Sequence, residues 1–273
     1  GEMIISETHS AYNCGYGVTC FGATDGSIDI TVEGGTEIYT YAWTGPDGFT
    51  STDEDLTAID AGTYTAVATD ENGCSISMDI EITEPDELTI SETHSTYNCG
   101  YGVTCFGATD GSIDITVLGG CLDYTYAWTG PDGFTSTDED LTAIGAGTYT
   151  VVATDDNGCF ISIDVEITEP AEELTISETH SDYSGYGVTC FGATDGSIDV
   201  TVLGGSDCVD YTYAWTGPDG FTSTDEDLTA IGAGTYTVVA TDDNGCFISI
   251  DVDITEPDGE MIISETHSAY NCG

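Results

Sequence analysis

Apolar and polar residues alternate along much of the chain, in short runs separated by glycine-rich turns. In the segment Ser112–Val117, isoleucine or valine occupies every second position, which is the period of a strand with one buried face. The segment Tyr124–Trp128 places Tyr124, Tyr126 and Trp128 on one face in the same way. No segment has a sustained helical period, so the pattern predicts an all-β protein.

The pattern recurs at an interval of about 85 residues, the size of one small domain. The string ISETHS begins at Ile5, Ile90, Ile176 and Ile263. Residues 259–273 then repeat residues 1–15 without a change, so the larger period contains three repeats. We expect immunoglobulin-like repeats at residues 1–85, 86–170 and 171–257, and the start of a fourth, a copy of the first, at residues 258–273.

The second repeat illustrates the strand order that we expect of every copy. Asn157-Gly158 predicts a tight hairpin, and Pro131 takes its preferred second position in a GPDG turn. Short strands with frequent turns, and one tryptophan per repeat, are typical of a β-sandwich. The predicted strands are Leu88–Ser95, Ser112–Val117, Tyr124–Trp128, Thr148–Asp155 and Cys159–Pro170.

The repeated strings resemble a known family. VTCFGATDGSIDITVLGG, YTYAW, LTAIGAGTYTVVATDDNGC and ITEP look like the SprB-type repeat, a PKD-like, immunoglobulin-like module of Bacteroidota surface proteins. The resemblance implies domains stacked head to tail in the stalk of a very long adhesin, related to gliding motility and exported by the type IX system. It also implies an extracellular, cell-surface location. Because no catalytic set of residues emerges from the repeated sequence, we expect no enzymatic activity.

The charge of the chain excludes several functions. There are 51 acidic residues and no Lys or Arg, for a net charge of −51. A basic patch for nucleic acid is therefore absent, as is electrostatic attraction to anionic lipid. Self-repulsion of this size requires screening, so we expect an ionic, extracellular setting. The sequence has neither a signal peptide nor an apolar run of about 20 residues that would insert into a membrane; we expect any such segment outside it.

Eleven cysteines without zinc-type spacing favour disulfides and a secreted protein. They fall into four classes by position in the repeat. Two classes occur in every copy, one in the glycine-rich corner between the first two strands and one after the Asn-Gly hairpin; the other two classes are each missing from one copy. The corner class is Cys20, Cys105 and Cys190; the hairpin class is Cys74, Cys159 and Cys246; the class at the start of the corner is Cys14, Cys99 and Cys272; the loop class is Cys121 and Cys208.

The missing cysteines indicate how the last two classes pair. If each Cys at the start of a corner bonds the loop Cys of the next repeat, Cys14 pairs with Cys121 and Cys99 with Cys208. Pairing within one repeat leaves Cys14 and Cys208 without partners. In an immunoglobulin-like sandwich the corner lies at the opposite end from these loops, so the corner of one repeat meets the loops of the next. We therefore predict disulfides between repeats.

Two pairings remain open for the other two classes. A strand of ten residues spans about 33 Å, whereas a disulfide requires Cα atoms within about 7 Å. This favours pairs between neighbours, Cys20–Cys159 and Cys105–Cys246. The alternative, which a first strand that switches sheets would allow, is pairing within repeats: Cys20–Cys74, Cys105–Cys159 and Cys190–Cys246.

Acidic residues recur in the loops and are candidate ligands for calcium, which takes oxygen donors. The alternative is ordinary turn chemistry, because Asp before Gly favours turns. None of the strings is an EF-hand loop. The candidates are Asp25, Asp29, Asp110, Asp114, Asp195 and Asp199 around the corner, and Asp70, Asp155, Asp156, Asp242 and Asp243 before the hairpin.

Two classes of function remain. The first is a structural stalk, stiffened by disulfides between repeats, whose partners are neighbouring repeats and other filament copies. The second is an adhesive module in which each repeat binds a surface glycan or protein. Near-identical copies favour the stalk, because binding modules usually diversify their loops. The four histidines lie on the first strand of each repeat, at His9, His94, His180 and His267, and form no catalytic set there.

Overall fold

The computed structural model describes residues 1–206, 210–259 and 262–265. The described part consists of antiparallel strands and short 3-10 turns, so the predicted all-β class is confirmed. Contacts group the chain into two compact units, residues 1–94, 112–142 and 147–166 in unit 1 and residues 95–111, 143–146 and 167–273 in unit 2. Within the described ranges, no helix is long and apolar enough to cross a bilayer.

The first repeat contains two sheets. One has three strands in the order β1-β2-β5, and the other has four in the order β4-β3-β6-β7. Neighbouring strands run antiparallel. The strands are β1 (Ile4–His9), β2 (Gly26–Glu33), β3 (Thr40–Thr44), β4 (Thr50–Ser51), β5 (Leu56–Ile59), β6 (Gly62–Thr69) and β7 (Ser75–Ile82), with 3-10 turns η1 (Asn13–Gly15) and η2 (Pro46–Gly48).

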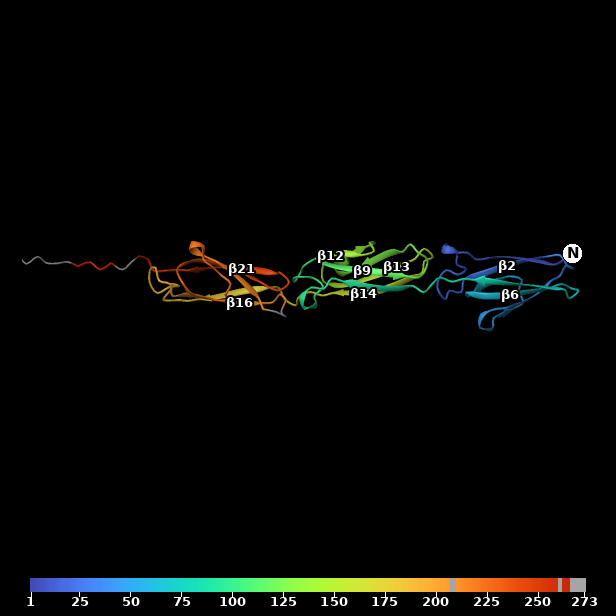
Figure 1. Ribbon diagram of the computed structural model, residues 1–273, viewed down its shortest axis with the longest axis horizontal. Coiled ribbons are helices and arrows are strands. Elements are labelled where there is room, and N and C mark those ends of the chain that lie inside the picture. The colour runs from blue at the N-terminus through green and yellow to red at the C-terminus, as the bar shows by residue number, and fades with distance from the viewer. Residues whose placement is uncertain (207–209, 260–261, 266–273) are drawn as a thin grey trace, which may run out of the picture. The chain divides into compact units, whose positions relative to one another are not determined.

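The second and third repeats have the same strand order. The second pairs β12-β9-β8 and β11-β10-β13-β14, and the third pairs β15-β16-β19 and β18-β17-β20-β21 (Figure 1). The second repeat comprises β8 (Thr89–His94), η3 (Asn98–Gly100), β9 (Gly111–Leu118), β10 (Thr125–Thr129), η4 (Pro131–Gly133), β11 (Thr135–Ser136), β12 (Leu141–Ile144), β13 (Gly147–Thr154) and β14 (Phe160–Ile167). The third comprises β15 (Thr175–His180), β16 (Gly196–Leu203), β17 (Thr212–Thr216), η5 (Pro218–Gly220), β18 (Thr222–Ser223), β19 (Leu228–Ile231), β20 (Gly234–Thr241) and β21 (Phe247–Ile254).

The core of each repeat lies between its two sheets. Ile28 and Ile30 on β2 alternate into the core, where they join Trp43 and Tyr64 from the other sheet. All four are at most 3% exposed, and burying a side chain of this size contributes about 1.5–3 kcal/mol. The Tyr64 hydroxyl donates to the carbonyl of Asp60 at 3.1 Å, which is the contact expected of a tyrosine corner.

The strands β5, β12 and β19 were not predicted from the alternation of residue types. In β5, Leu56 and Ile59 are buried while the two residues between them are exposed, a spacing of three that a strand period does not give. Ala58 has a φ of 55°, and the pairing of β5 with β2 shifts register between Gly26 and Ser27. This irregularity in the backbone hides the strand from a period-two pattern.

Candidate functional sites at the joints between repeats

The glycine-rich corner of the first repeat, residues 12–25, is fixed to the end of its own sandwich. The Gly17 N–H donates to the Thr83 carbonyl, just after β7, at 2.9 Å. The Asp25 carboxylate accepts the N–H of Thr19 at 3.0 Å and its hydroxyl at 2.6 Å. These contacts close the corner into a defined shape.

The hairpin of the second repeat is organised by one buried carboxylate. Asp155 is 5% exposed and accepts the N–H groups of Asn157 and Cys159, each at 2.9 Å. Its other oxygen accepts the N–H of Cys121 at 2.8 Å, so it joins the hairpin to the preceding loop. The same role falls to Asp70 with Thr36, Asn72 and Cys74, and to Asp242 with Ser206, Asn244 and Cys246.

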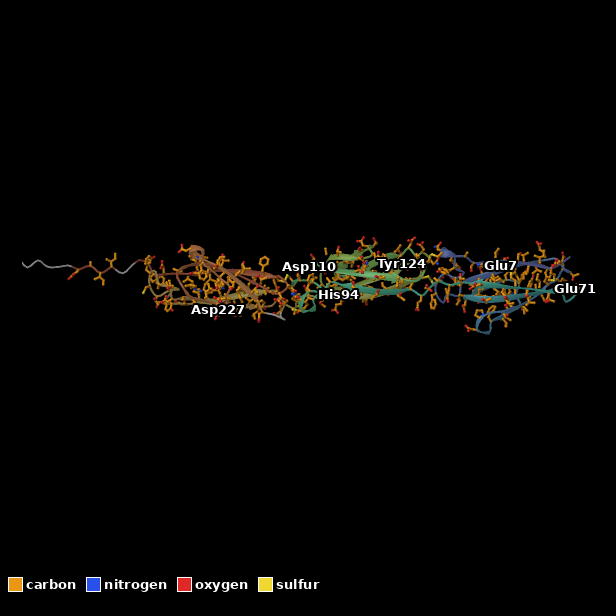
Figure 2. The ribbon with its side chains drawn as sticks, in the orientation of Figure 1. Glu7, Glu71, His94, Asp110, Tyr124 and Asp227 are labelled. Carbon is orange, nitrogen blue, oxygen red and sulfur yellow. A yellow bond between two sulfur atoms is a disulfide. The ribbon has the colours of Figure 1, made fainter. Side chains whose placement is uncertain are left out.

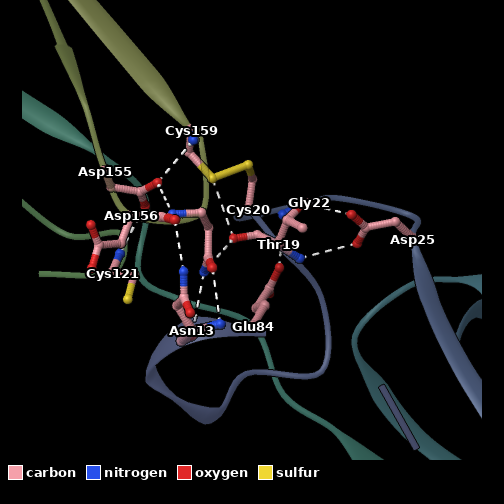
Figure 3. The surroundings of a disulfide bond; sticks show 11 residues. Asn13, Thr19, Cys20, Gly22, Asp25, Glu84, Cys121, Asp155, Asp156 and Cys159 are labelled. Atoms are coloured by element: carbon pink, nitrogen blue, oxygen red, sulfur yellow. Dashed lines mark hydrogen bonds between the residues drawn. A yellow bond between two sulfur atoms is a disulfide. The ribbon is translucent and has the colours of Figure 1, made fainter. Parts of the chain in front are cut away.

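We call the contact between the corner of the first repeat and the loop and hairpin of the second joint 1; it lies within unit 1. Two disulfides cross it, Cys14–Cys121 and Cys20–Cys159, and Figure 3 shows the second of them. Their Cα–Cα distances are 5.8 and 5.7 Å, within the usual range for disulfides. Both therefore join one repeat to the next.

A pair of asparagines also crosses joint 1. The backbone N–H of Asn13 donates to Oδ1 of Asn157 at 3.0 Å, and the Asn13 side chain donates to the carbonyl of Asp156 at 2.8 Å. In return, Nδ2 of Asn157 donates to the carbonyl of Thr19 at 3.2 Å. Sequence reasoning missed this pair, although an asparagine precedes every cysteine at the start of a corner, at Asn13, Asn98 and Asn271.

Joint 2, between the corner of the second repeat and the hairpin of the third, lies within unit 2 and repeats these contacts. Cys105 and Cys246 form a disulfide with a Cα–Cα distance of 5.8 Å. The backbone N–H of Asn98 donates to Oδ1 of Asn244 at 2.9 Å, and its side chain donates to the carbonyl of Asp243 at 2.8 Å. Cys99 is also in a disulfide; Cys208, its partner in the predicted Cys99–Cys208 pair, lies outside the described residues.

The structure does not bring together the corner and hairpin cysteines of one repeat. The corner of the first repeat contacts Thr83, whereas its hairpin ends at Cys74, and β7 lies between them. Eight residues of strand span about 26 Å, far beyond the reach of a disulfide. Figure 2 shows Glu71 at this hairpin end of the first repeat. Among the described cysteines, Cys74 and Cys190 are free and exposed.

The candidate calcium ligands are dispersed. Within residues 1–206, 210–259 and 262–265, no group of three or more His, Cys, Asp or Glu side chains is placed to hold a metal ion. The corner acids Asp25, Asp110 and Asp195 each bind a threonine. Their expected companions Asp29, Asp114 and Asp199 are exposed residues of β2, β9 and β16, and Asp156 and Asp243 are exposed in the hairpins.

The local hydrogen bonds favour ionised carboxylates without a cation. The N–H of Cys74 lowers the pKa of Asp70, and the Thr189 hydroxyl lowers that of Asp195. Such donors stabilise the negative charge directly. They also point their positive ends at oxygen atoms that a calcium ion would use, which weighs against calcium at Asp70 and Asp195. Calcium binding to the chain stays a prediction for experiment.

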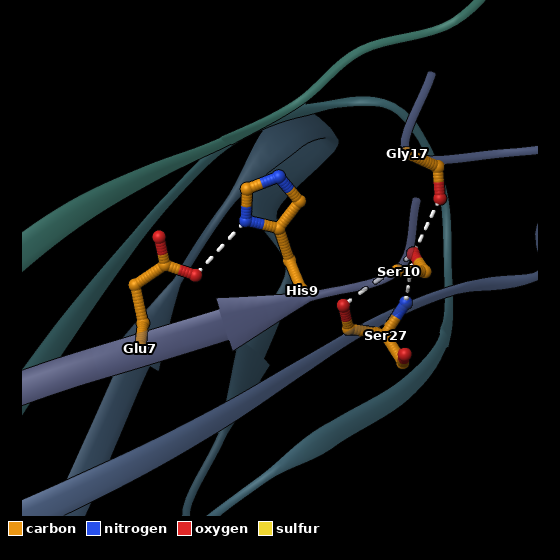
Figure 4. Close-up of polar contacts among 5 residues, drawn as sticks. All are labelled: Glu7, His9, Ser10, Gly17 and Ser27. Carbon is orange, nitrogen blue, oxygen red and sulfur yellow. Dashed lines mark hydrogen bonds and ion pairs between the residues drawn. The ribbon is translucent and has the colours of Figure 1, made fainter. Parts of the chain in front are cut away.

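Each described histidine lies beside an acid on the same strand. Nδ1 of His9 lies 2.9 Å from Oε2 of Glu7 (Figure 4). His94 and His180 form the equivalent pairs with Glu92 and Glu178; His267 lies outside the described residues. Next to His9, Ser10 accepts the N–H of Ser27 at 3.0 Å, which fixes the start of the corner.

Comparison with known proteins gives the family of these repeats. A family model described as the SprB repeat matches residues 18–48, 103–133 and 188–220. Three segments of the chain thus match the SprB repeat. Each match runs from the valine of the corner to the last glycine of the GPDG turn, so it includes the corner cysteine and excludes the hairpin cysteine.

Several solved structures are similar to this chain, at low sequence identity. A structure from a 1.5-MDa bacterial ice-binding adhesin has 12% identity and a TM-score of 0.45, over 94% of this chain and 98% of that one. A Ca2+-stabilised adhesin of an Antarctic bacterium has 14% identity and a TM-score of 0.41, over 94% and 73%. Extracellular domains 3–5 of Drosophila OTK have 14% identity and a TM-score of 0.30, over 86% and 92%. A search of curated proteins finds no match.

Proposed function

We propose that the chain is a stalk segment of a secreted, cell-surface adhesin, in which disulfides between neighbouring repeats stiffen the array. The observation that carries this proposal is joint 1, where two disulfides and an asparagine pair connect successive repeats. Three SprB repeats in one chain support an adhesin made of repeats. We further propose that the stalk serves gliding motility, is exported by the type IX system and has no enzymatic activity.

Covalent joints would counteract the electrostatic repulsion between neighbouring repeats of this sequence. With 51 acids and no Lys or Arg, neighbouring repeats repel each other and form no lysine or arginine salt bridges across a joint. Each hydrogen bond of the asparagine pair contributes only about 0.5–1.5 kcal/mol. A disulfide, by contrast, keeps the two repeats together at any ionic strength, so the stalk does not depend on screening by salt.

Electron microscopy of the native material tests the proposal. We expect thin fibres whose persistence length falls sharply when the disulfides are reduced and alkylated. Alkylation without reduction is the control, because it modifies the free thiols and leaves the joints intact. Compact particles instead of fibres would contradict the stalk, and an unchanged persistence length after reduction would contradict stiffening by disulfides.

A further inference from the structure

The two free cysteines of the described chain occupy positions that are bonded elsewhere in it. Cys190 in the third corner corresponds to Cys20, and Cys74 in the first hairpin corresponds to Cys159. Cys20 and Cys159 form a disulfide across joint 1. Within the described residues, the third corner and the first hairpin thus each have the features of one half of such a joint.

The third corner already has the shape that binds a hairpin. The N–H and the hydroxyl of Thr189 bind Asp195 at 3.1 and 2.7 Å, as those of Thr19 bind Asp25 in joint 1. The Gly187 N–H donates to Thr255 at 2.8 Å, which ties this corner to the end of its own sandwich. Its backbone therefore presents Cys190 as the first corner presents Cys20.

The first hairpin is also preformed. Asp70 accepts the N–H groups of Asn72 and Cys74, each at 2.9 Å. Thr36 takes the place of a loop cysteine, and its hydroxyl donates to Asp70 at 3.0 Å. The side-chain amide of Asn72 donates to the Thr36 hydroxyl at 2.9 Å, so this amide has a hydrogen-bond partner within its own repeat.

The differences between these two halves and joint 1 are complementary. Where the first corner has Asn13-Cys14, the third has the single residue Ser184, and the first repeat has no loop cysteine. A third-type corner on a first-type hairpin therefore leaves no thiol unpaired. A first-type corner on a first-type hairpin would leave Cys14 without a partner, and a third-type corner on the second repeat would leave Cys121 without one.

We propose that the third corner binds the first-repeat hairpin of a second copy of this sequence, and that Cys190 and Cys74 then form a disulfide. This rests on the proposed function, in which corners and hairpins of successive repeats form joints. The order of the repeats agrees with this pairing, because residues 259–273, which follow the third repeat, have the sequence of the start of the first repeat. The positions of the cysteines and asparagines thus specify which corner binds which hairpin.

The oxidation requires an external disulfide, such as oxidised glutathione. The Cys190 thiolate attacks its sulfur–sulfur bond, forming a mixed disulfide and releasing one glutathione thiolate. The Cys74 thiolate of the second copy attacks the protein sulfur and releases the second. Two protein thiols and one oxidised glutathione give one protein disulfide and two reduced glutathiones.

The experiment mixes two variants of the full chain, both carrying Cys272→Ser to exclude that thiol. One has Cys74→Ser and retains Cys190; the other has Cys190→Ser and retains Cys74. They are oxidised with oxidised glutathione in about 1 M salt, where the screening length is about 3 Å. A glutamate-specific protease is used for mapping, because the chain has no Lys or Arg.

We expect the mixture to give a covalent heterodimer linked between Cys74 and Cys190, in at least about fivefold excess over either homodimer, since one net hydrogen bond already gives a bias of this size. The parent with both thiols should form a ladder of head-to-tail oligomers. Equal yields of heterodimer and homodimers, or no heterodimer, would overturn the proposal. If the peptide map of the same sample still contained the Cys20–Cys159 disulfide, either result would leave the proposed function unaffected.

Discussion

Pulling the chain from its two ends should expose the disulfides of the joints directly. The shortest covalent path between the ends runs from residue 1 to Cys14, crosses to Cys121, returns along the chain to Cys105, and crosses to Cys246 before residue 273. This path contains about 56 residue steps in place of about 270, so at about 3.4 Å per step the ends can separate by about 200 Å in place of about 930 Å.

The load within the second repeat would then pass along one strand. Between Cys105 and Cys121 the path follows β9, and the rest of that repeat bears no force once the path is taut. Removing Cys14 leaves Cys20–Cys159 as the next shortest route, which contains about 100 steps and extends to about 350 Å. The three lengths differ enough to be separated in one experiment.

The assay is single-molecule pulling between peptide tags fused to both ends, with maximum extension as the readout. We expect about 200 Å for the oxidised chain, about 350 Å for Cys14→Ser and about 930 Å under a reductant, excluding the tags. Cys74→Ser is the matched control, because it removes a free thiol and no disulfide. An oxidised chain that extended well beyond about 200 Å, although mass spectrometry showed its cysteines to be in disulfides, would refute disulfide crossing of the joints.

Three further predictions concern charge. Asp155→Ala should lower the free energy of unfolding by about 2–4 kcal/mol, because it leaves buried N–H donors without an acceptor. Asp156→Ala, at the exposed neighbouring position, should change it by less than about 0.5 kcal/mol, and urea titration measures both values. Burial, and then a hydrogen bond to a glutamate, raises the pKa of Tyr41, Tyr126 and Tyr213 to about 12. The fold favours the neutral phenol, so this stabilisation is complete below pH 10 and lost as the pH rises through about 12; ultraviolet absorbance should show these three tyrosines titrating near pH 12. A chelator should leave the melting temperature unchanged, and a lower value would restore the calcium hypothesis.

Alternation along the chain was sufficient to predict the sandwich, because most strands keep a strict period of two. It missed β5, where Ala58 adopts a left-handed backbone and the register shifts. That departure depends on the pairing with β2, which no local pattern records. The turns were easier to predict, since Pro131 and Gly158 restrict or free the backbone at single positions.

The cysteine positions carried information about the joints because a missing cysteine in one class accompanied a missing partner in another. The asparagine pair had a weaker pattern of the same kind, with Asn13 and Asn98 present only where a cysteine follows. What the sequence did not reveal is that Asn157 receives Asn13, since Asn-Gly is also the ordinary requirement of a hairpin. Because the hairpin alone accounts for Asn157, the sequence gives no separate sign of its second role at the joint.

The buried carboxylates explain how a chain without basic residues can position its joints. Among the described residues, the only buried charged side chains are Asp70, Asp155 and Asp242, and each accepts N–H groups from its own hairpin and from the preceding loop. Backbone dipoles thus supply the stabilisation that lysine or arginine provides in other proteins. In the second and third repeats the N–H groups bound include that of the hairpin cysteine itself, so the carboxylate orients the residue whose sulfur crosses the joint. The acidity of the chain and its covalent assembly therefore meet at Asp155 and Asp242.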